Sequence, residues 1–219
     1  MSGGMLIIAG AGPGIGLAAA RRFGAEGLTV ALIGRREEAL TGYQRELEDA
    51  AIKAIFRVAD CADATQFDAA LQEILSAAGP ADALLYNAAN IKWKNLLDDT
   101  AAALTADFAV NVAGALTAVR AVLPAMRTRN RGTLLLTGSS FSENPVASFG
   151  SLSISKAGLR SLGHSVAQSL RDTAIKVHYL SISGRVSAED PLRSPQLIAE
   201  RCWQLHAGTK EPATIDIVI

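Results

Sequence analysis

Three glycines near the start of the chain have the spacing of an anion-binding turn. Gly10, Gly14 and Gly16 lie between an apolar run, residues 5–8, and an amphipathic segment that begins near Ile15. Glycine has no Cβ, adopts positive φ and lets backbone N–H groups approach a bound anion, so this order predicts a strand, a tight turn and a helix. The helix dipole would favour the same anion. We therefore expect a nucleotide pyrophosphate in a dinucleotide-binding βαβ unit; the alternative is a plain turn that caps a buried strand.

Two arginines follow the second predicted strand, about 20 residues beyond the glycine turn, where an NAD-binding unit usually places Asp or Glu on the ribose hydroxyls. The sequence instead has Gly34, Arg35 and Arg36 there. A carboxylate would repel a 2′-phosphate, whereas guanidinium groups can bind one through paired hydrogen bonds. The sequence therefore predicts NADP in preference to NAD. The alternative is an exposed basic pair at a helix start, because two glutamates follow at once.

The elements that must position these residues alternate between strand and helix. Apolar, β-rich runs predict strands at residues 5–8, 28–33, 54–59, 83–86, 133–137, 175–182 and 214–219. Helical spacing predicts one helix that begins near Ile15, a second that follows Arg36 and ends near Ala50, and four more over residues 65–78, 100–127, 151–171 and 195–206. Pro124 is expected to kink or end the helix over residues 100–127. No linker or repeat divides the chain. We expect one domain over residues 1–219, a doubly wound, mostly parallel Rossmann sheet of about seven strands.

Composition excludes several other classes. The 219 residues carry no formal net charge, which gives no support for a nucleic-acid partner. Only Cys61 and Cys202 are present, far apart, so a disulfide framework is not indicated and a reducing cytoplasm is expected. The pattern contains no run of about 18 apolar residues, so we expect a soluble protein with no membrane partner. His164, His178 and His206 share no ligand spacing, and no metal is expected.

The glycine spacing resembles that of the short-chain dehydrogenase/reductase family, and further motifs extend the resemblance across nearly the full chain. Asp60 resembles the family's acidic residue beside the adenine, and Asn87, after Tyr86, resembles the end of its Asn-Asn-Ala-Gly motif. Gly184 and Val186 lie in a segment similar to the one beside the nicotinamide. The residues thus expected to contact the cofactor are Gly10, Gly14, Ile15, Gly16, Arg35, Arg36, Asp60, Asn87, Lys156, Gly184 and Val186.

Three polar residues resemble the catalytic residues of this family. Asn111 is similar to the asparagine that supports the family's proton relay, and Ser139 to the serine that polarises the substrate carbonyl. Lys156 resembles the lysine of the Tyr-x-x-x-Lys motif. The alternative for Ser139 is a loop serine that bonds to its own backbone. The resemblance implies hydride transfer between a nicotinamide and a small carbonyl or alcohol.

The tyrosine of that motif is absent. Leu152 stands four residues before Lys156 and thirteen after Ser139, and both intervals mark the family's tyrosine. Leucine cannot protonate the alkoxide that hydride transfer leaves, and positioned acid–base catalysis contributes about 10²–10⁴ in rate. A water held between Lys156 and Ser139 is the expected substitute donor. The sequence therefore supports two hypotheses, an NADP-dependent oxidoreductase with atypical proton donation and a non-catalytic NADP-binding protein.

Two further features concern partners. The long apolar helices that contain Asn111 and Lys156 resemble those that build family dimers, so we expect a homo-oligomer, a dimer or tetramer; the alternative is simple packing on the sheet. Residues 92–94 (KWK) follow the Asn87 motif and lie either near the substrate mouth or in a surface loop with one packed Trp.

Overall fold

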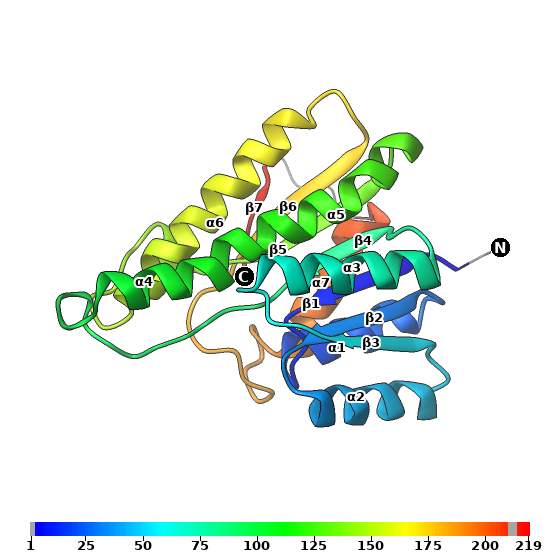
Figure 1. The fold of residues 1–219 in the computed structure, drawn as a ribbon, viewed down its shortest axis with the longest axis horizontal. Coiled ribbons are helices and arrows are strands. Elements are labelled where there is room, and N and C mark those ends of the chain that lie inside the picture. Colours follow the sequence, from blue (N-terminus) through cyan, green and yellow to red (C-terminus); the bar gives the residue numbers. More distant parts are fainter. Residues whose placement is uncertain (1–2, 210–213) are drawn as a thin grey trace.

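A parallel sheet with helices on both faces forms the centre of the computed structural model, which describes residues 3–209 and 214–219 (Figure 1). Within these residues the sheet has seven strands in the order β3-β2-β1-β4-β5-β6-β7, and every neighbouring pair is parallel. The strands are β1 (Met5–Ala9), β2 (Thr29–Gly34), β3 (Ala54–Val58), β4 (Ala83–Tyr86), β5 (Gly132–Thr137), β6 (Ile175–Ser181) and β7 (Asp216–Val218). The predicted doubly wound Rossmann fold is confirmed.

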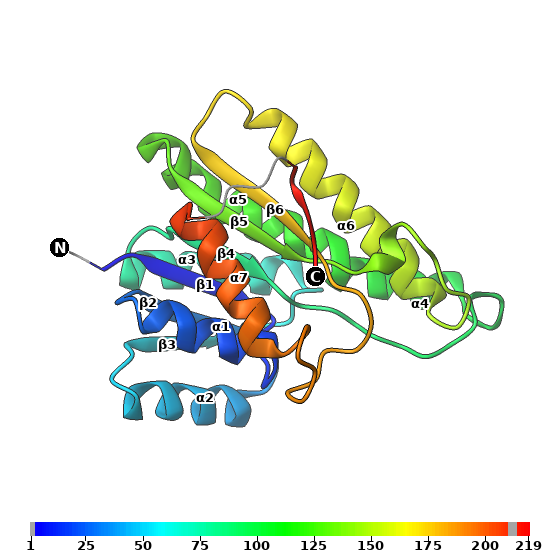
Figure 2. The ribbon, with the colours of Figure 1, turned by 180° about the vertical axis from the view of Figure 1, so that it is seen from behind.

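Helices cover the two faces of the sheet in two groups. They are α1 (Ile15–Gly24), α2 (Glu37–Asp49), α3 (Ala64–Ala78), α4 (Ala101–Phe108), α5 (Gly114–Arg129), α6 (Gly150–Ser169) and α7 (Pro195–Ala207). The helices α3, α4, α5 and α6 lie on the face seen in Figure 1, and α1, α2 and α7 on the face seen in Figure 2. Side chains of a strand alternate between faces, so Ile7 joins one buried cluster whereas Leu6 and Ile8 join the other.

The strand order reverses at β1, which pairs with β2 on one side and β4 on the other. The register aligns Ala9, the last residue of β1, with Ile33 of β2 and Tyr86 of β4. The residues that follow these strands therefore meet at one edge of the sheet. A reversal of this kind opens a crevice at the carboxyl ends of the strands, where ligands of such sheets bind.

The long helix predicted over residues 100–127 is interrupted in the structure. A π-helical turn, Ala109–Ala113, separates α4 from α5. Pro124 was predicted to kink or end the helix; it lies inside α5, which continues to Arg129, so it does not end the helix. Pro124 is exposed, and water can bond to the carbonyl that loses its N–H partner. By length and composition the run Ala101–Arg129 can cross a membrane, but 44% of its most apolar stretch is buried within the protein.

Two glycines of the turn differ in whether a side chain could be added to them. Gly10 has φ of +85°, and a Cβ there would lie 2.3 Å from the backbone nitrogen of Ala88. A Cβ on Gly12 would meet no atom within 4 Å. Gly10 therefore serves the packing of the turn against the end of β4, whereas Gly12 leaves open space above it.

We predict that Gly10→Ala lowers the free energy of unfolding by about 1–3 kcal/mol or more, since an alanine at positive φ is strained and its methyl group meets backbone. Gly12→Ala should change this free energy by less than about 0.5 kcal/mol. Urea titration of the two variants measures both effects. Equal stability losses in the two variants would contradict this assignment.

Candidate functional site

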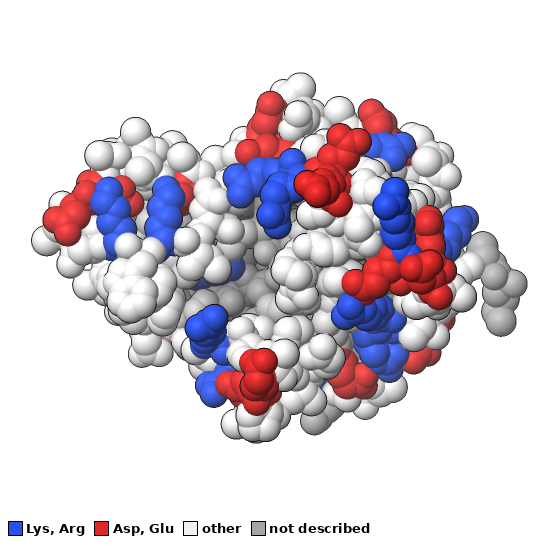
Figure 3. All heavy atoms as spheres, turned by 90° about the horizontal axis from the view of Figure 1, so that it is seen from below, with Lys and Arg blue, Asp and Glu red and all other residues white. Residues whose placement is uncertain are grey.

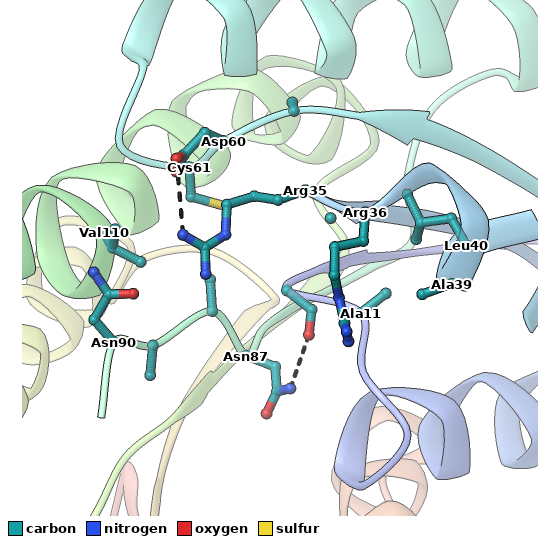
Figure 4. Close-up of a pocket in the computed structure, with 15 residues that line it drawn as sticks. Ala11, Arg35, Arg36, Ala39, Leu40, Asp60, Cys61, Asn87, Asn90 and Val110 are labelled. Carbon is teal, nitrogen blue, oxygen red and sulfur yellow. Dashed lines mark hydrogen bonds and ion pairs between the residues drawn. The ribbon is translucent and has the colours of Figure 1, made fainter. Parts of the chain in front are cut away.

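A pocket of about 520 Å³ lies at the carboxyl ends of β1, β2, β3 and β4 (Figure 4). Five of the residues that the sequence predicts to contact a cofactor line it: Gly10, Arg35, Arg36, Asp60 and Asn87. Gly34, which precedes the two arginines, lines it as well. They come from separate parts of the chain, and the parallel register brings them to one place. Sequence reasoning missed Val110 and Cys61 in the lining, because neither residue type marks a polar site.

Helix α1 begins beside this pocket without a capping side chain. Gly14 is its N-cap, and its first turn contains no acidic residue. The N–H groups of Leu17 and Ala18 donate to the carbonyls of Gly12 and Gly14. A Cβ on Gly12 or Gly14 would project into open space. An uncapped helix N-terminus over open space fits an anion such as a pyrophosphate.

Asn87 fixes the glycine turn from the end of β4. Its Nδ2 donates to the carbonyl of Gly10 over 3.0 Å, and its backbone N–H donates to the carbonyl of Ala9 over 2.8 Å (Figure 4). The turn is thus held in one geometry by a side chain and a backbone group of another strand.

The two arginines reach the same pocket from the end of β2. Arg36 is the N-cap of α2, and both arginines are exposed. An Arg35 nitrogen lies 4.0 Å from a carboxylate oxygen of Asp60. This pair contributes little to stability, because the side chains are 63% and 40% exposed. The guanidinium groups are therefore available to a phosphate, and no carboxylate occupies the end of β2 itself.

Lys156 is buried beside β5. Its Nζ donates to the carbonyl of Thr137 over 2.6 Å, and burial lowers its pKa from 10.5 to about 8. Thr137 Oγ1 is buried without a hydrogen-bond partner among the described residues, which makes it a place for a bound water or ligand group. Leu152, one turn earlier on α6, is 6% exposed and brings no proton donor.

Ser139 lies in a local turn after β5. Its Oγ accepts from the N–H of Phe141 over 3.2 Å, and its own N–H donates to the hydroxyl of Tyr179 over 3.1 Å. The bond from Phe141 is the local side-chain-to-backbone contact that the alternative, a loop serine bonded to its own backbone, predicts. The accepting bond still leaves the Ser139 hydroxyl hydrogen free to be directed elsewhere.

Asn111 lies in the π-helical turn and is fully buried. Its side chain accepts from the N–H of Asn90 over 2.7 Å and donates to the carbonyl of Asn90 over 3.3 Å. The hydroxyl of Tyr86 donates to the carbonyl of Val110 over 2.5 Å. The turn is thus attached to β4 and to the segment that follows it, which is consistent with a supporting position.

A buried carboxylate next to this turn was missed by sequence reasoning. Asp107 is 1% exposed and accepts from Ser151 Oγ over 2.6 Å, and Lys92 Nζ lies 2.7 Å from it. Ser151 directly precedes Leu152. An acidic residue inside an alanine-rich helical run was the available signal, but its partners are distant in sequence.

The remaining residues predicted to contact a cofactor lie outside the lining of the pocket: Gly14, Ile15, Gly16, Lys156, Gly184 and Val186. Ile15 and Val186 pack partly buried against the cluster under α1 and α7. Gly184 is exposed with φ of +78°, in a segment where Arg193 donates to the carbonyl of Ser183. Their contact with a cofactor stays a prediction.

The fold and the site define a dinucleotide-binding α/β protein, and comparison with known proteins gives its family. The family model described as short chain dehydrogenase matches residues 5–187. An oxidoreductase, asL5, of Sarocladium schorii is 30% identical over 181 residues, which are 83% of this chain and 72% of that protein. An uncharacterized oxidoreductase, YvrD, of Bacillus subtilis is 29% identical over 80% of this chain and 65% of its own length. The chain belongs to the short-chain dehydrogenase family.

A solved structure supports the same assignment. A metagenomic short-chain oxidoreductase in complex with NADP is 28% identical and superposes with a TM-score of 0.88 over 100% of this chain and 97% of that one.

Proposed function

We propose that the protein is an NADP-dependent oxidoreductase that interconverts a small carbonyl compound and its alcohol. The observation that carries the proposal is the pocket at the strand ends, which Gly10, Arg35 and Arg36 line. The turn that begins at Gly10 leads directly into the uncapped N-terminus of α1. The similar metagenomic oxidoreductase binds NADP. Bound NADPH supplies a hydride to the carbonyl carbon. Gly10, Asn87 and Asp60 hold the nucleotide, and Arg35 and Arg36 bind its 2′-phosphate.

The proton comes from a water held by Lys156 and Ser139. Reduction leaves an alkoxide that must gain one proton, and Leu152 has none to give. Lys156 in its ammonium form donates through the water, and the buried Thr137 Oγ1 offers a second polar contact beside it. Asn111 supports this arrangement from the π-helical turn. The burial of Leu152 also favours a second candidate function, a non-catalytic NADP-binding protein.

We also propose that the chain acts as a homo-oligomer in the cytoplasm. Phe108, Leu116 and Ile154 are 39%, 45% and 39% exposed on α4, α5 and α6, which leaves apolar surface for a second copy. Cys61 and Cys202 are buried free thiols, and burial raises their pKa values to about 11 and about 12. Such thiols suit a reducing compartment.

We predict that replacing Arg35 and Arg36 together by alanine weakens NADPH binding about 10-fold or more and leaves NADH binding unchanged, because only NADPH carries the 2′-phosphate. Calorimetric titration measures both affinities. Arg45→Ala, also exposed on α2, is the matched control and should bind NADPH normally. Equal losses for both nucleotides would remove the phosphate-binding role.

We predict slow NADPH-dependent reduction of ketones and aldehydes by the unaltered protein. The rate should fall as pH rises through about 8, since Lys156 has its pKa lowered to about 8 and is protonated only below it. Lys156→Ala should abolish the reaction.

Leu152→Tyr should raise the rate about 10²-fold or more, because a phenol adds a positioned acid. Leu152→Phe adds the ring without the hydroxyl and serves as the control. Turnover that appears only in Leu152→Tyr would reject the enzyme and establish the non-catalytic alternative.

We predict that light scattering gives a mass at least twice the 22.8 kDa of one chain. Replacing Leu116 and Ile154 by glutamate should reduce it to that of the monomer, because charges oppose burial of the apolar face. Leu197→Glu, at an equally exposed leucine of α7, should leave the mass unchanged. A monomeric unaltered protein would disprove the assembly.

A further inference from the structure

Two segments from different strand ends pair with each other at the surface. The N–H of Lys94 donates to the carbonyl of Ser148 over 2.8 Å, and the N–H of Leu96 donates to the carbonyl of Ala147 over 3.2 Å. The first segment follows β4 and the second precedes α6. A Cβ on Gly150 would lie 2.4 Å from Leu96 Cβ, so the glycine at the start of α6 permits this close approach. Backbone bonds therefore fix a segment that exposes its side chains.

Three aromatic rings connect these segments to the predicted catalytic serine. The ring centroids of Phe141 and Phe149 are 5.4 Å apart, with an angle of 27° between the ring planes. The centroids of Phe149 and Trp93 are also 5.4 Å apart, at 47°. Phe141 donates its N–H to Ser139 Oγ. We call these three rings the aromatic wall; it extends from Ser139 to the surface at Trp93.

The outer end of the aromatic wall is exposed to solvent. Trp93 is 82% exposed, and Ile91 and Leu97 beside it in sequence are 68% and 93% exposed. The second tryptophan, Trp203, packs instead against Phe23 in the core region under α1. An exposed tryptophan held by fixed backbone beside other apolar side chains is typical of a binding surface.

The positive charges around Trp93 are paired with carboxylates, so they do not favour an anionic ligand. Lys92 Nζ lies 2.7 Å from Asp107, and Lys94 Nζ lies 3.0 Å from Asp99, so each neighbouring cation has a carboxylate partner. In Figure 3 the projection at the left, at the end of the molecule where α4 lies in Figure 1, has blue and red groups side by side with uncharged atoms around them. The surface therefore suits a neutral apolar ring.

We propose that the aromatic wall binds the ring of the substrate, which is a neutral ketone or aldehyde bearing an aromatic group. Trp93 and Phe149 contact the ring, and the carbonyl lies toward Ser139. This inference rests on the proposed oxidoreductase function for the reaction, but ring binding itself needs neither turnover nor NADPH. Trp93 is thus a specificity-determining residue.

The test uses protein labelled with 5-fluorotryptophan, which gives two fluorine resonances because the chain has two tryptophans. Trp203→Phe assigns them. Titration with 2-acetylnaphthalene should shift the Trp93 resonance to saturation and leave that of Trp203 in place. Butanone and the anion 2-naphthoate should shift neither. An unmoved Trp93 resonance, or equal binding of 2-naphthoate, would overturn the proposal, as would a shift that follows protein concentration instead of ketone.

Kinetics separate this inference from the proposed function. Trp93→Ala should raise KM for 2-acetylnaphthalene about three- to tenfold with kcat nearly unchanged, as expected for the loss of one aromatic contact, and should leave butanone kinetics unaltered. A saturable Trp93 shift without turnover would reject the oxidoreductase and retain the aromatic wall. Turnover that is indifferent to Trp93→Ala for both ketones would reject the aromatic wall and retain the oxidoreductase.

Discussion

The close contact between the glycine turn and the end of β4 constrains the rest of this structure. Gly10 has positive φ and leaves no room for a Cβ beside Ala88, and Asn87 bonds to the carbonyl of Gly10. These contacts set the direction in which α1 leaves β1. Because β1 is the strand at which the order of the sheet reverses, the same contacts place the start of the glycine turn at the crevice. The proposed anion site is therefore a consequence of how one turn packs.

A second constraint acts on Lys156, which is buried beside β5. Burial alone lowers the pKa of Lys156 to about 8, which places its proton exchange near working pH. The resemblance to the family implies a tyrosine four residues before this lysine, whereas the chain has Leu152 there and the lysine donates to the carbonyl of Thr137. The proposed chemistry follows from this difference. Either the lysine passes its proton through a water, or the site binds nucleotide without reaction.

Strands and most helices were predictable because buried parallel strands are short apolar runs bounded by turn residues. Ala83–Tyr86, for example, was predicted with the bounds that the structure shows. The π-helical turn was not predictable, because it depends on bonds from Asn111 to Asn90 and from Tyr86 to Val110 across more than 20 residues. The pairing of Asp107 with Ser151 spans 44 residues and leaves no local pattern.

Site residues divide along the same line. Gly10, Arg35, Arg36, Asp60 and Asn87 were predicted together and lie around one pocket, because each follows a strand whose register is fixed. The direction of Lys156 Nζ and the aromatic wall depend on loop packing, which spacing in the sequence does not encode.

Hydrogen exchange of the backbone amides over residues 12–18, with and without NADP, tests the central claim most directly. The account predicts that NADP slows exchange at the start of α1, where N–H groups bond to the pyrophosphate, and leaves the far end of the sheet unchanged. Unchanged exchange at these amides with saturating NADP would contradict it.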